Sequence, residues 1–91
     1  GIADEFGISR RKLIRYNDQH KNYVPNKGDI IYLHRKYWRA KKPYQHHVVQ
    51  EGESMHLISQ MYGVRLKRLY KMNDVEPATY APMEGDIIRL R

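Results

Sequence analysis

The stretch YVPNKGDIIYL, residues 23–33, returns almost unchanged as YAPMEGDIIRL, residues 80–90, and seven of the eleven paired positions are identical. The similarity extends backwards, because IADEFGISRRKLIRYND (2–18) aligns with ISQMYGVRLKRLYKMND (58–74). Together the two alignments contain 12 identities in 28 pairs. An internal repeat at this level indicates the organisation of the chain before any secondary structure is assigned.

The repeat divides the 91 residues into three parts. Residues 1–34 form a first copy, residues 35–43 (RKYWRAKKP) a short basic linker, and residues 44–91 a complete second copy. The first copy lacks a counterpart of YQHHVVQEGESMH (44–56), so it is truncated at its N-terminus. If it folds, its missing strand must be replaced by a neighbouring molecule, by the linker or by nothing.

Local signals in the second copy predict the order strand, helix, helix, strand. The β-branched run 46–50 reads as a strand, and Ser54 then stands where a helix N-cap is expected. Apolar residues at helical spacing follow on both sides of Gly63, which ends the first helix. Residues 75–85 have loop chemistry, and DIIRL (86–90) closes as a strand.

We therefore predict an α+β fold of tandem small β-α-α-β units, each a two-stranded antiparallel sheet packed on a helix pair, because two strands alone are marginal. Ser9 is a good N-cap for the second helix of the first copy, whereas Arg65 is a weaker cap at the matching position. The core expected for the second copy is Val49, Ile58, Tyr62, Val64, Leu69, Ile88 and Leu90.

Composition restricts the partners without choosing one. Seventeen Lys and Arg face ten Asp and Glu, a net charge of +7, which favours an anionic partner or simply keeps a small domain soluble. There is no cysteine, and no apolar run approaches the roughly 20 residues of a membrane span. The anionic classes left open are nucleic acid, an acidic envelope polymer and a membrane surface.

The ordered set of motifs resembles the LysM domain. It comprises GES (52–54) after the first strand, YGV (62–64) between the helices, Asn73 at the end of the second helix and PxxGD (82–86) before the last strand. The chain is thus identified as tandem LysM domains, the first one truncated. It departs from the family at Glu53, where Asp is usual, and at Asp86 and Asp29, where Gln is usual.

The resemblance implies a non-catalytic module that binds N-acetylglucosamine-containing glycan, peptidoglycan or chitin, in a groove between two loops. Carried over by position, the ligand-binding residues are Gly52, Glu53, Ser54 and Met55, then Val75, Glu76, Pro77, Ala78, Thr79 and Tyr80. Structural roles compete with this assignment, because Gly52 could serve only the turn, Ser54 only the cap and Tyr80 only packing. In the first copy one wall remains, at residues 19–23, so that copy should bind poorly.

The resemblance also implies the setting of the chain. We expect the targeting part of a larger bacterial cell-wall hydrolase, located in the periplasm, in the cell envelope or outside the cell. Peptidoglycan is the expected partner, nucleic acid is not, and the incomplete first repeat could mediate self-association. No cofactor and no metal site are expected.

The alternative is a helix-turn-helix protein that binds DNA. Each copy places cations on its second helix, at Arg10, Arg11, Lys12 and Arg15 and at Arg65, Lys67, Arg68 and Lys71. That class normally needs a third helix, whereas both copies continue into the predicted strand.

An enzyme site finds little support. His46 and His47 are adjacent, so on a strand they point to opposite faces and cannot share a metal ion. Glu51 and Glu53 are expected to be solvated rather than an acid/base pair. Trp38, the single tryptophan, is expected to pack against a neighbouring repeat.

Overall fold

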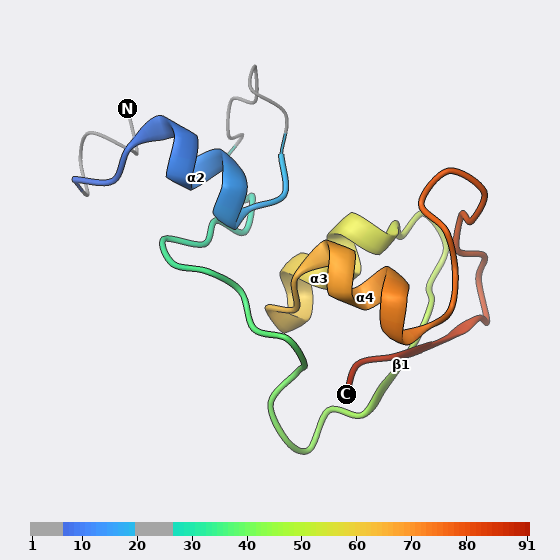
Figure 1. Ribbon diagram of the computed structural model, residues 1–91. Helices are drawn as coiled ribbons and strands as arrows, with labels where there is room; N and C mark the ends of the chain where they lie inside the picture. Colours follow the sequence, from blue (N-terminus) through green and yellow to red (C-terminus); the bar gives the residue numbers. More distant parts are fainter. Residues whose placement is uncertain (1–6, 20–26) are drawn as a thin grey trace.

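A computed structural model describes residues 7–19 and 27–91. Along the chain they form α2 (Arg10–Tyr16), β1 (His46–Val48), α3 (Met55–Tyr62), α4 (Leu66–Met72) and β2 (Ile87–Arg89) (Figure 1). β1 and β2 pair antiparallel, with His47 opposite Ile88. The β-α-α-β order predicted for residues 44–91 is therefore confirmed.

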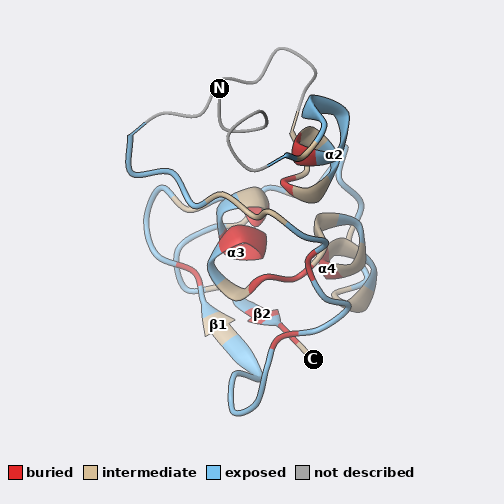
Figure 2. Cartoon of the chain, turned by 90° about the vertical axis from the view of Figure 1, so that its left-hand side faces the viewer, coloured by how far each residue is buried: buried red, intermediate tan, exposed pale blue. Residues whose placement is uncertain are grey.

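The elements lie in layers, with the two-stranded sheet on one side of the α3–α4 pair and α2 on the other (Figures 1 and 2). The core lies between the sheet and the helix pair, where Figure 2 shows buried residues in red. Every residue predicted for the core is buried, except Tyr62, which is half-buried and packs against it. Two further residues join this core, Ala40 and Met55.

The helix ends follow the local signals. The Ser54 hydroxyl accepts a hydrogen bond from the Leu57 N–H at 3.0 Å, and Gly63 ends α3 with φ +67°. Ser9 caps α2 in the same way. Arg65 makes no side-chain cap for α4, as predicted, and the Asp18 carboxylate instead accepts from the Leu66 N–H at 3.2 Å. A residue of the first half therefore completes a helix of the second.

Asn17 organises the corner after α2. Its side-chain amide donates to the carbonyl oxygens of Leu13 and Tyr32, both at 2.8 Å, and its side-chain oxygen accepts from the Tyr32 N–H at 2.6 Å. Fifty-six positions later, Asn73 makes the same three bonds with Leu69 and Arg89, at 2.8, 2.9 and 2.7 Å. The residues after the two asparagines share a left-handed backbone, with φ 53° at position 18 and 54° at position 74. The aligned sequences thus make the same local structure.

The first half nevertheless has no sheet among its described residues. Residues 29–34 align with β2 but are not a strand, so the expectation of a two-stranded sheet in each unit is wrong there. The reason is the missing counterpart of β1, without which no ladder can form. Hydrogen bonds from side chains hold this segment instead. One of them runs from the Gln60 amide to the Ile30 carbonyl at 2.9 Å. Of the wall expected at residues 19–23, residues 20–23 lie outside the described residues.

Residues 35–43 are part of the folded unit rather than a free linker. The Tyr37 N–H donates to the Gly63 carbonyl at 2.6 Å, and the Ala40 N–H to the Leu90 carbonyl at 2.8 Å. Ala40 is buried in the core. This segment has no apolar periodicity because backbone hydrogen bonds, and not a row of apolar side chains, attach it to the fold.

Trp38 lies over α4 without being buried. The residue is 60 % exposed, and the guanidinium carbons of Arg65 and Arg68 stand 5.0 and 5.6 Å from the ring centroid. Trp38 therefore packs against the second repeat, as expected, through cation–π contacts that leave most of the residue exposed.

Candidate functional site

The first predicted loop is a tight turn between β1 and α3. Gly52 is exposed with φ +81°, a backbone conformation that favours glycine, and the Glu53 N–H closes the turn onto the Gln50 carbonyl at 3.1 Å. The Glu53 carboxylate accepts from the Gln50 N–H at 2.7 Å and lies 2.8 Å from His47 Nε2. These two interactions, the backbone bond first, hold the pKa of Glu53 below its usual value.

A chain of side chains continues from this turn into the fold. His47 Nδ1 lies 2.7 Å from the Tyr62 hydroxyl, so Glu53, His47 and Tyr62 connect the loop, β1 and the end of α3. Glu53 is thus internally paired, contrary to the expectation of a solvated carboxylate, whereas Glu51 is exposed as expected. His46 is more exposed than His47, in line with the predicted alternation of faces.

The second predicted loop begins with a compact turn. The Glu76 carbonyl accepts from the N–H groups of Thr79 and Tyr80 at 3.2 and 2.9 Å, and the residues between them, Pro77 and Ala78, are exposed. Val75 is half-buried at the start of the loop and packs on the core.

A second carboxylate fixes the end of this loop. Asp86 accepts from the Met83 N–H at 3.0 Å and from the Tyr80 hydroxyl at 2.8 Å. These bonds lower the pKa of Asp86, while burial and then Asp86 itself raise the pKa of Tyr80. Each predicted loop is therefore held by one acidic side chain.

The fold brings the two loops to one apolar cluster. Met55 from the first loop and Val75 and Tyr80 from the second all pack in or on the same core. Backbone hydrogen bonds also hold the bases of the two loops together. The Val49 N–H donates to the Asp86 carbonyl at 2.8 Å, and the Gly85 N–H donates to the Val49 carbonyl at 2.9 Å.

Several of the predicted ligand-binding residues use their side chains for contacts within the fold. Met55 is only 1 % exposed, so its side chain serves the core, contrary to the expected cover for an acetyl group. Ser54 and Tyr80 make internal hydrogen bonds through their hydroxyls. The surface left to a ligand is the turn at Gly52 and the exposed run 76–79. Such a surface offers backbone polar groups and small apolar patches.

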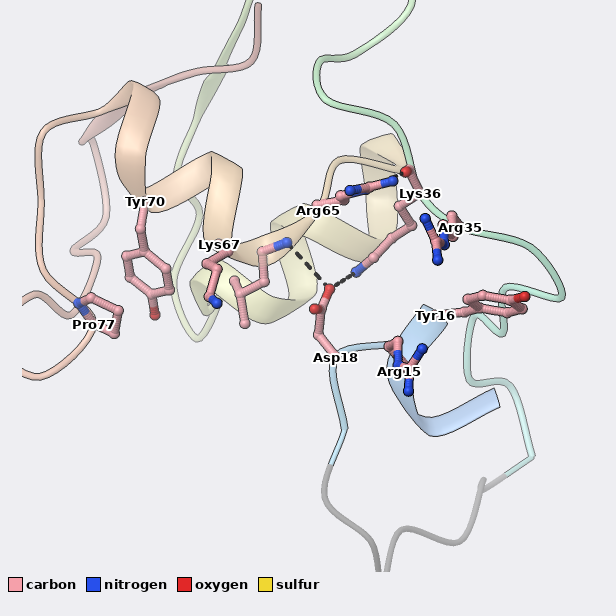
Figure 3. A pocket seen from close by; sticks show the side chains of 10 residues that line it. Arg15, Tyr16, Asp18, Arg35, Lys36, Arg65, Lys67, Tyr70 and Pro77 are labelled. Atoms are coloured by element: carbon pink, nitrogen blue, oxygen red, sulfur yellow. Dashed lines mark hydrogen bonds and ion pairs between the residues drawn. The ribbon is translucent and has the colours of Figure 1, made fainter. Parts of the chain in front are cut away.

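A groove of about 630 Å³ between the two halves was not foreseen. Figure 3 shows the side chains along it, from Tyr70 and Pro77 at one end to Arg15 and Tyr16 at the other. Its remaining lining is Asp18, Arg35, Lys36, Arg65, Leu66 and Lys67. Three of the helix cations, Arg15, Arg65 and Lys67, face this one groove, an arrangement that appears only in the folded chain.

The floor of this groove holds an almost fully buried lysine. Lys36 Nζ lies 2.6 Å from the Asp18 carboxylate and donates to the side chains of Gln60 and Ser59 at 2.6 and 3.0 Å. Burial lowers the pKa of Lys36, and the neighbouring Asp18 opposes that shift. The polar pair Ser59-Gln60, which interrupts the apolar stripe of α3, was the available signal for this buried network.

The described residues contain neither a metal-binding cluster nor a membrane-spanning helix. Within residues 7–19 and 27–91, no three His, Asp or Glu side chains gather as a metal ion would require. No helix in the same ranges combines the length and the apolar character of a membrane span.

Comparison with known families agrees with this geometry. A family model described as the LysM domain matches residues 47–91, which include both loops, α3, α4 and β2. No curated protein matches the chain. LysM domains are non-catalytic modules that bind carbohydrate of the peptidoglycan and chitin type, and they typically occur in extracytoplasmic or cell-wall-associated proteins. Residues 47–91 are therefore similar to a LysM domain.

Proposed function

We propose that residues 44–91 bind N-acetylglucosamine-containing cell-wall glycan, namely peptidoglycan, through the loops 52–55 and 75–80. The observation that carries the proposal is the pair of exposed turns at one end of a LysM core, each tied down by a carboxylate, Glu53 or Asp86. Turns fixed in this way lose little conformational freedom when a ligand binds.

The chemistry of the turns suits this ligand. N-acetylglucosamine carries an amide N–H, a carbonyl, several hydroxyls and an apolar methyl group. Backbone groups at Gly52 and at residues 77–79 can meet the polar atoms, and the half-buried ring of Tyr80 offers an apolar edge. A shallow site of this kind buries little ligand surface, so a modest affinity at a single site is expected.

We further propose that residues 1–34 are a LysM-like repeat that lacks its first strand and first loop. The matching bonds of Asn17 and Asn73, and the matching backbone at Asp18 and Asp74, support a common origin. Without the first loop this copy retains no complete groove. The second copy then carries binding, as the targeting part of a larger bacterial cell-wall hydrolase that works in the periplasm, the envelope or outside the cell.

The test is a calorimetric titration of the chain with soluble N-acetylglucosamine oligomers, which avoid the avidity of a polymer. Gly52→Val forces a β-branched residue into φ +81° and should abolish binding. Gly28→Val is the matched control, because Gly28 has φ +91°, and a Cβ at either glycine meets nothing within 4 Å. The control should bind like the parent chain.

Circular dichroism must first show that both variants fold. Binding by a folded Gly52→Val variant at the parental affinity would remove the first loop from the site. Affinity for neutral oligomers should also be nearly independent of salt, whereas tight, salt-sensitive binding to duplex DNA would favour the helix-turn-helix alternative.

A further inference from the structure

The groove between α2 and α4 is strongly cationic. Five Lys or Arg side chains line it, and Asp18 is the single acidic residue among them. The groove lies where the last turn of α2 faces the first turn of α4, with residues 35 and 36 between them (Figure 3). This charge comes from both halves of the chain and from the segment that joins them.

Two of these cations already have partners. Lys36 is ion-paired with Asp18, whose carboxylate also caps α4. Arg65 donates through Nε to the Lys36 carbonyl at 3.1 Å and stacks on Trp38. The Asp18 carboxylate is therefore occupied by contacts within the fold and does not neutralise the other cations of the groove.

Three cations remain for a ligand, Arg15, Arg35 and Lys67. All three are exposed, and no ion pair joins them to a described residue. They stand apart around the Asp18–Lys36 pair rather than in an unbroken row (Figure 3). Such a spacing suits separate oxyanions better than the continuous phosphates of a polyanion.

One end of the groove belongs to the proposed glycan site. Pro77 lines the groove and is also part of the second loop, and Tyr70 forms an apolar wall beside it. A glycan held at that loop would present its substituents toward Lys67 and then toward Arg15 (Figure 3).

Resting on the function proposed above, we infer that this groove binds carboxylates carried by the glycan itself. Its ligand is the acidic, peptide-bearing strand, and the groove is what makes the chain prefer that strand to a neutral N-acetylglucosamine polymer. Because the three cations are exposed, their attraction should be screened by salt, whereas the contact with the sugar should not be.

The test compares two soluble ligands of equal sugar length by calorimetry. One is a neutral N-acetylglucosamine oligomer, and the other is a peptidoglycan fragment whose stem peptide has free carboxylates. The test variant combines Arg15→Gln, Arg35→Gln and Lys67→Gln. The control variant combines Arg11→Gln, Lys12→Gln and Lys71→Gln, which removes the same charge from exposed positions outside the groove.

The parent chain and the control should bind the acidic fragment about tenfold more tightly than the neutral oligomer at low salt, the sum expected for a few exposed ion pairs. The groove variant should bind the two ligands equally, with its affinity for the neutral oligomer unchanged. Equal binding of both ligands by the parent chain, or a preference that survives in the groove variant, would overturn the inference and leave the proposed function standing.

Two other outcomes also decide the matter. If the parent chain binds neither ligand, both proposals fail. If a polyol-phosphate polymer or duplex DNA binds more tightly than the peptide-bearing fragment, and that binding is lost in the groove variant, the groove is an anion site but the assignment of carboxylates is wrong.

Discussion

The described parts of the first half, residues 7–19 and 27–34, make the same corner after a helix as residues 44–91 and complete it differently. In the second half, the strand that follows Asn73 pairs with β1 and covers an apolar core. In the first half, the corner at Asn17 meets the polar face of α3, where Gln60 donates to the Asn17 side chain at 3.0 Å and His56 Nε2 lies 2.7 Å from its carbonyl oxygen.

This difference shows how the fold accommodates the loss of a strand in the first half. The aligned residues keep their local geometry, but different interactions stabilise that geometry in the two halves. Ser59, Gln60 and the buried Lys36 supply hydrogen bonds where a strand partner would have supplied a ladder and apolar contact. We therefore expect the first half to be stable only while the second half is folded.

The largest difference between the halves is expected when the two aligned buried leucines, Leu69 and Leu13, are each truncated to alanine. Leu69 is fully buried, and Leu69→Ala should cost about 2–5 kcal/mol, enough to unfold a domain of this size. Leu13→Ala, at the aligned position, should loosen α2 and leave α3, α4 and the sheet folded.

Thermal unfolding followed by circular dichroism measures the first effect, and amide hydrogen exchange resolved by residue measures the second. A shift of only a few degrees for Leu69→Ala would show that the core does not depend on this leucine. Global unfolding of the Leu13→Ala variant would show that the second half also depends on the first for its stability.

Removal of the Asn17 side chain should have an intermediate effect. Asn17→Ala leaves the Tyr32 N–H without its acceptor and removes one of the two acceptors of the Gln60 amide, at a cost of about 1–3 kcal/mol for buried polar groups. The Tyr32 bond lies within the first half and the Gln60 bond joins it to α3, so exchange protection should fall at Tyr32 while the amides of β2 stay protected. The comparison with Asn73→Ala, which should expose β2 instead, tests whether the two corners are independent. Equal loss of protection in both halves for either variant would contradict the separation.

Local signals made much of the second half predictable. Ser54, Gly63 and the apolar spacing of α3 and α4 act within a few residues, so the helix ends and nearly the whole core follow from neighbouring positions. The likeness of Asn17 and Asn73 likewise predicts a shared corner, because the bonds to Leu13 and Leu69 span only four residues.

What could not be predicted depends on partners that are distant in sequence. The triplet Asp-Ile-Ile occurs at 29–31 and at 86–88, yet only the second copy contributes a strand, because a strand needs an edge to pair with. The burial of Lys36 depends on Asp18 and Gln60, which lie 18 and 24 positions away. Glu53 looks solvated until the turn brings it to His47. Met55 sits in a predicted ligand loop and yet belongs to the core.

Acid should produce the smallest effect, confined to the two loops of the second half. The pKa values of Glu53 and Asp86 are lowered in the folded chain, so their stabilising contribution is complete above the ordinary carboxyl range, near pH 4, and is lost as the pH falls through the lowered values. Protonation would release the Gln50 and Met83 N–H groups and loosen the turns without unfolding the core.

Two-dimensional NMR of the chain between neutral pH and about pH 3 would follow this change. Amide signals of residues 50–54 and 79–86 should move or broaden together, while those of α2 stay in place, and affinity for a neutral N-acetylglucosamine oligomer should fall over the same range. Glu53→Gln keeps an acceptor that does not titrate, so it should reduce the pH response of the first loop and spare that of the second. An unchanged affinity at low pH, with the loop signals shifted, would mean that the turns need no carboxylate to hold a sugar.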